Sequence, residues 1–147
     1  MMSLLLPPEV AAMNDLISAA MHCARVLRHA VENGAAGDAA GTLEELAAAR
    51  EALAEALADA VRDLDHTPPD EGLPHEWEVL ESTWADIRAG MSGDAARVAR
   101  DQCLTAERRL MDTARAATGE ALPASVAGTV SKFAGASADD VIPDWSA

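Results

Sequence analysis

The chain has 147 residues, of which half are apolar, and a formal net charge of −14 at pH 7. This length fits one domain with a hydrophobic core of its own. The charge argues against a nucleic-acid-binding protein, because phosphate contacts need clustered Lys and Arg. It also disfavours binding to an anionic membrane surface. Basic or metallic partners are compatible with it, although a solvated acidic surface is the simpler interpretation.

Alanine dominates the apolar residues, whereas Tyr is absent and Phe occurs once. Such a composition favours an all-α protein. The N-terminal stretch MMSLLLPPEV has no basic residue, and its apolar run stops after three leucines, so we expect neither a signal peptide nor a membrane span. With Cys23 and Cys103 as its two cysteines, the chain is expected to be cytoplasmic with reduced thiols.

The first predicted helix covers about residues 8–32, since Pro7 and Pro8 suit a helix start and Asn33-Gly34 suits a helix end. Apolar residues spaced by three and four mark its buried face: Val10, Met13, Ile17, Ala20, Ala24, Leu27 and Val31. The second predicted helix, over 42–64, carries a similar stripe: Leu43, Leu46, Leu53, Leu57, Val61 and Leu64. Thr42 and Glu45 have the spacing of a capping box, and Pro68-Pro69 lies in the loop that ends the helix.

Three more helices are predicted, over about 74–91, 95–118 and 123–135, followed by a tail at 136–147 that is either loosely held or docked. Four long helices with short connections predict a single domain folded as an up-down-up-down four-helix bundle. The short fifth helix is expected to pack across one end.

A carboxylate-bridged di-metal centre is the typical chemistry of such a bundle, and it requires two Glu-x-x-His motifs. The chain has none, and the nearest match is Asp63-Leu64-Asp65-His66 at the end of the second helix. We therefore predict no metal site. If an iron or manganese site has been rebuilt, its candidate ligands are Glu81, Glu107, Asp63 and His66.

Glu81 and Glu107 flank the predicted buried faces of the third and fourth helices. A buried Glu needs a partner or stays protonated. The simpler interpretation is a structural Glu paired with an Arg or a backbone group. The alternative is a residual metal or ligand site between these two helices.

Acidic residues recur every four positions on the second helix, at Glu51, Glu55, Asp59 and Asp63. The fourth helix carries arginines on its polar side, at Arg97, Arg100, Arg108 and Arg115. In a simple bundle these two helices lie diagonally, so the charges would pair only between subunits of a dimer. A solvated acidic face is the simpler interpretation.

Cys23 and Cys103 lie near the middles of two helices that should be antiparallel neighbours. Buried free thiols are the simpler interpretation, whereas a redox pair would need Cα atoms within about 7 Å. His22 and His29 are expected at the surface or its boundary. In the acidic tail, Ile142 and Trp145 are candidate interaction residues, either docking a partner or covering the open end of the bundle.

The chain resembles a bacterial family of ferritin-like four-helix bundles, domain of unknown function 2383, over about residues 13–130. The resemblance rests on Asn14-Asp15-Leu16-Ile17, the loop from Thr67 to Gly72, Trp84, Glu107 and Leu122-Pro123. Family members carry an acidic residue where this chain has Ala24, and a histidine where it has Glu81. The resemblance therefore implies a ferritin-like fold whose ancestral metal site is lost or rebuilt.

Together these observations predict a binding or accessory protein without a catalytic motif or a cofactor, which binds a protein partner or itself. The alternative is a carboxylate di-metal protein, an iron- or manganese-binding oxidase with a rebuilt site.

Overall fold

The structure is a computed structural model and describes residues 6–69 and 95–145. The elements within these residues are all helical: α1 (Pro8–Glu32), the 3-10 turn η1 (Gly37–Ala39), α2 (Ala40–Asp63), α4 (Ala95–Ala117), α5 (Ala124–Ala134) and α6 (Ala138–Val141). The all-α prediction is therefore confirmed for this part of the chain. The helix predicted over 74–91, with Trp77, Glu81 and Trp84, lies outside the described residues.

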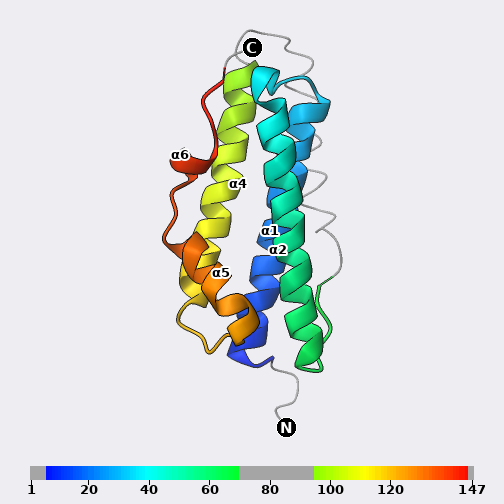
Figure 1. The fold of residues 1–147 in the computed structure, drawn as a ribbon, viewed down its shortest axis with the longest axis vertical. Helices are drawn as coiled ribbons and strands as arrows, with labels where there is room; N and C mark the ends of the chain where they lie inside the picture. The colour runs from blue at the N-terminus through cyan, green and yellow to red at the C-terminus, as the bar shows by residue number, and fades with distance from the viewer. Residues whose placement is uncertain (1–5, 70–94, 146–147) are drawn as a thin grey trace.

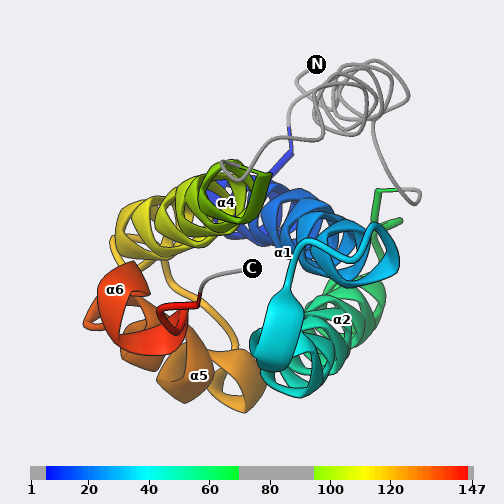
Figure 2. The ribbon, with the colours of Figure 1, turned by 90° about the horizontal axis from the view of Figure 1, so that it is seen from above.

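The three long helices α1, α2 and α4 lie side by side (Figure 1). α2 returns antiparallel to α1 along one flank, and α4 runs antiparallel to α1 along the other. Viewed end-on, α4, α1, α2 and α5 follow one another around a ring (Figure 2). α5 contacts both α4 and α2. The fifth helix therefore closes the side of the bundle between α4 and α2, whereas the sequence led us to expect it across one end.

The helix α1 has the widest buried surface, because α2 and α4 cover it from two sides. Its fully buried residues include Met13, Ala20, Cys23 and Leu27. The stripe on α2 is also buried at Leu43, Leu53, Leu57 and Val61, as predicted from its period. Leu46, also in the predicted stripe, is half-buried against the core. Leu64 has 41% of its surface exposed, because α2 ends at Asp63 and the chain then turns.

The ends of α1 follow the sequence signals. Pro7 precedes the first turn of the helix, and Gly34 follows its end with φ of 71°, a conformation that suits glycine. The capping box predicted at Thr42 is wrong. The turn η1 leads directly into α2 at Ala40, so Thr42 already lies inside the helix, and no side chain caps its start.

Candidate functional site

A buried ion pair between Arg50 and Glu107 lies inside the bundle. Their exposed fractions are 5% and 0%, and they are the buried charged residues of the described part of the chain. Arg50, on α2, donates two hydrogen bonds to Glu107, on α4. Its Nε lies 2.7 Å from Oε2 and its NH2 nitrogen 2.7 Å from Oε1. This parallel geometry is the strongest form of an arginine–carboxylate pair.

Two further side chains complete this group. The Cys23 thiol, on α1, donates a hydrogen bond to Oε2 of Glu107 over 2.8 Å. The Arg50 guanidinium lies 4.6 Å from the centre of the Phe133 ring, on α5, close enough for a cation–π contact. We call Cys23, Arg50, Glu107 and Phe133 the central cluster. It takes one residue from each of the four helices around the ring.

The electrostatics of the central cluster favour a charged Arg50 side chain and a protonated Cys23 thiol. Burial alone lowers the pKa of Arg50, but hydrogen bonding and the charge of Glu107 outweigh burial and raise it. Burial, followed by the charge and hydrogen bond of Glu107, holds the pKa of Cys23 well above its usual value of 9.0. Because the thiolate is the reactive form, Cys23 is not poised as a nucleophile.

Cys103, on α4, is a second buried thiol. Burial and the nearby charge of Glu107 raise its pKa to about 12, although Arg100 acts in the opposite direction. Both cysteines are free and buried. The prediction of buried core thiols is therefore confirmed, and their raised pKa values disfavour thiolate chemistry near neutral pH.

The pairing of Glu107 with an arginine is the contact that the structural interpretation of this residue predicted. Arg50 was missed as its partner, although a signal was present. Arg50 lies three residues before Leu53 and seven before Leu57, so it falls on the apolar stripe of α2. A charged residue inside such a stripe requires a buried counter-charge.

The other candidate metal ligands do not join Glu107. Asp63 and His66 lie at the C-terminal end of α2 and beyond it, where Asp63 is exposed and His66 half-buried. Glu81 lies outside the described residues. Among residues 6–69 and 95–145, no three His, Cys, Asp or Glu side chains come together as potential metal ligands.

The acidic series on α2 finds partners within its own chain. Arg28, on α1, binds Glu51 with nitrogen–oxygen distances of 2.5 and 3.0 Å. Arg62 lies 2.9 Å from Asp59 and 3.8 Å from Glu55. Glu51, Glu55 and Asp59 are therefore paired within the chain, which relieves part of the repulsion along this face without a second subunit.

The arginines of α4 hold the C-terminal tail. Arg100 donates from Nε to the Pro143 carbonyl over 2.9 Å and pairs with Asp144 at 2.8 Å. Arg108 lies 3.3 Å from Asp139. Lower on the helix, Arg115 donates to the carbonyls of Ala134 and Ala136 over 3.0 and 3.3 Å.

The two tail residues singled out from the sequence both contact the bundle. Ile142 is 1% exposed and belongs to the core. The Trp145 indole is half-buried and donates to the Ala35 carbonyl, after the end of α1, over 2.7 Å. The tail is therefore docked, and in this conformation Trp145 and Ile142 face their own chain.

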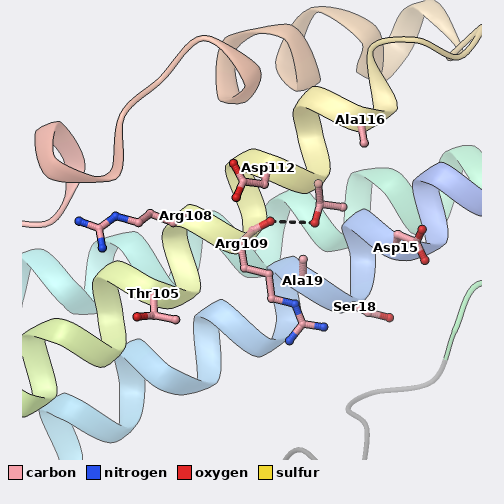
Figure 3. A pocket seen from close by; sticks show the side chains of 9 residues that line it. Asp15, Ser18, Ala19, Thr105, Arg108, Arg109, Asp112 and Ala116 are labelled. Carbon is pink, nitrogen blue, oxygen red and sulfur yellow. Dashed lines mark hydrogen bonds between the residues drawn. The ribbon is translucent and has the colours of Figure 1, made fainter.

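An open groove lies between α1 and α4 on the outside of the bundle (Figure 3). Its volume is about 860 Å³. Its lining is Asp15, Ser18 and Ala19 from α1, and Thr105, Arg108, Arg109, Asp112, Thr113 and Ala116 from α4. Within it the Thr113 hydroxyl donates to the Arg109 carbonyl over 2.7 Å. Most of these side chains are polar and reach solvent, unlike the central cluster.

Comparison of the chain with protein-family models, curated proteins and solved structures found no match. The resemblance to the ferritin-like family therefore stays a prediction. None of the described helices is long and apolar enough to cross a membrane.

Proposed function

We propose that the protein is a cytoplasmic, ferritin-like up-down helical bundle that works as a protein-binding accessory module. The central cluster is the observation that carries this proposal. In a di-metal bundle, inward-facing carboxylates are left to the metal ions. Here both oxygens of Glu107 already accept from Arg50, and Oε2 also accepts from Cys23.

Glu107 does not fit the di-metal alternative. A divalent cation beside it would face the fixed positive charge of Arg50, whose pKa is raised and which cannot act as a ligand. The central cluster is therefore best explained as a structural lock between helices. Polar groups that remain open to solvent lie on the outside, as in the groove between α1 and α4, where a protein partner could reach them.

One preparation of the full chain, purified without chelators, tests this proposal. We expect far less than one iron or manganese ion per chain by elemental analysis. Stoichiometric metal that is lost in Glu81→Ala and Glu107→Gln would overturn the proposal in favour of the di-metal alternative. Light scattering across a salt series on the same sample decides between self-association and a separate partner. A monomer at low salt and high concentration would exclude self-association.

A further inference from the structure

We infer that the arginine-bearing face of α4 is a binding surface for acidic peptide segments, and that the chain's own tail occupies it as an internal competitor. The external ligand would be a partner-protein segment that resembles the tail in chemistry. Its sequence would place an aliphatic residue between acidic residues and end in an aromatic residue. This inference rests on the proposed binding function and names the class of its partner.

The charge distribution supports an acidic ligand. Five of the 11 Lys and Arg residues of the chain lie on α4: Arg97, Arg100, Arg108, Arg109 and Arg115. Arg100, Arg108 and Arg115 are spaced by eight and seven residues, about two helical turns each, so they lie on one side of the helix. A protein with a net charge of −14 thus carries one locally basic strip.

The tail shows which contacts a peptide segment can make with these arginines. The tail carbonyls of Ala136 and Pro143 accept from Arg115 and Arg100, contacts that the backbone of another peptide can also make. Selectivity comes from side chains, because Asp139 and Asp144 pair with Arg108 and Arg100. Ile142 is buried in the apolar core, and the indole of Trp145 donates to the Ala35 carbonyl.

The fit of the tail is incomplete at one point. A hollow of about 280 Å³ lies between α4 and the start of the tail. Arg108, Met111, Asp112 and Arg115 line it from α4, and Ala136, Ser137 and Ala138 from the tail. The tail offers only small side chains here, so a segment with larger residues at these positions would fill space that the tail leaves open. Such a segment can compete although the tail is tethered.

The covalent link between the tail and the bundle determines how weakly an external peptide should bind. A linked segment competes at an effective concentration of about a millimolar, so an external peptide binds the intact chain weakly. Weakening the chain's own tail removes this competition. Ile142→Asp places a charge in the apolar core and should weaken tail docking most. Trp145→Ala is a milder change and is used if the first variant does not fold.

The probe is a fluorescein-labelled peptide with the sequence ASADDVIPDWSA, titrated with full-length protein and followed by fluorescence anisotropy. We expect Ile142→Asp or Trp145→Ala protein to bind the peptide at least about tenfold more tightly than the wild-type chain. Adding Arg100→Ser should abolish this gain, whereas Arg109→Ser, on the side of α4 that faces the groove with α1 (Figure 3), should retain it. A probe in which both Asp139 and Asp144 are replaced by Asn should bind more weakly than the parent peptide.

The inference is overturned if both tail variants, folded by circular dichroism, fail to bind the peptide, or if Arg100→Ser leaves binding unchanged. A wild-type dimer that becomes monomeric in Ile142→Asp would assign the surface to the tail of a second copy and overturn the assignment to a separate partner. These results are independent of the metal analysis. Absence of peptide binding refutes this inference alone, whereas stoichiometric metal refutes the proposed function.

Discussion

Two arginine–carboxylate pairs of similar geometry occupy very different environments in this protein. The side chains of Arg50 and Glu107 are 7% and 0% exposed, whereas those of Arg28 and Glu51 are 41% and 51% exposed. Burial removes the water that would otherwise solvate a lone charge, so breaking the inner pair leaves an uncompensated ion. The outer pair is screened by solvent, and its contribution to stability is small.

Glu107→Gln should therefore lower the free energy of unfolding by about 3–5 kcal/mol, because Arg50 stays buried without its counter-charge. Glu51→Gln is the matched control and should cost less than about 1 kcal/mol, since Arg28 can turn to water. Urea unfolding measures both. The double change Arg50→Met with Glu107→Leu should recover most of the loss, because it removes both charges. Equal costs for the two Gln variants would contradict the structural role of the inner pair.

The two buried thiols make stability depend on alkaline pH. Each has a folded-state pKa above its unfolded value of 9.0, so the folded state holds its proton more tightly. Their stabilising effect is complete below pH 9 and is lost as the pH rises toward the folded values, about 12 for Cys103. The slope should be about 1.4 kcal/mol per pH unit for each thiol.

Few other groups titrate in this window, since the chain has no Tyr and a single Lys, Lys132. Urea unfolding between pH 8 and 11 should therefore show a decline that is shallower in Cys103→Ala. Loss of the Cys103 side chain also lowers the free energy of unfolding by the same amount at every pH. This constant difference does not affect the slope of that free energy against pH. A slope identical to that of the wild-type chain would show that Cys103 does not contribute.

At the scale of elements, α4 connects α1, α5 and the tail. One side packs against α1, another against α5, and its arginines bind the tail. Its charges looked from the sequence like a solvated face or a dimer contact. They instead hold an acidic segment of the same chain, because that segment follows α5 closely and returns along α4 (Figure 1).

The tail should consequently contribute to the stability of the bundle. Ile142→Ala is expected to cost about 2–5 kcal/mol in free energy of unfolding, because the residue is fully buried against the core. Leu64→Ala is the control, since Leu64 is 41% exposed and should cost less than about 0.5 kcal/mol. Thermal unfolding compares them. If Ile142→Ala behaves like Leu64→Ala, the tail is not part of the cooperative unit.

At the scale of the whole molecule, the described helices form a ring around the central cluster, with α5 and the tail along one side (Figure 2). This arrangement separates a closed interior from the outer surfaces of the bundle. The charged side chains of the central cluster are satisfied by hydrogen bonds within the cluster. The outer surfaces of the described residues include the groove between α1 and α4 and the arginine-bearing face of α4, where we propose that partners bind.

Four of the described helices could be located from the sequence alone, whereas the short η1 and α6 were not predicted. Apolar spacing of three and four located α1, α2, α4 and α5 to within about two residues, since burial of one face is a local, periodic property. Pro8 and Gly34 marked the ends of α1 because their backbone preferences are intrinsic. Thr42 misled because the same capping pattern is compatible with a helix that starts earlier, when a preceding turn such as η1 supplies the first bonds.

The pairing of charges depends on how the helices pack and could not be predicted from the sequence. Arg50 and Glu107 are 57 residues apart, and Arg100 and Asp144 are 44 residues apart, so no local pattern connects them. A helical period shows which face is buried but not which neighbour covers it, and a charge pair depends on that neighbour. The central cluster and the docked tail therefore follow from the packing of α1, α2, α4 and α5. The sequence pattern of each helix predicts only the buried face of that helix.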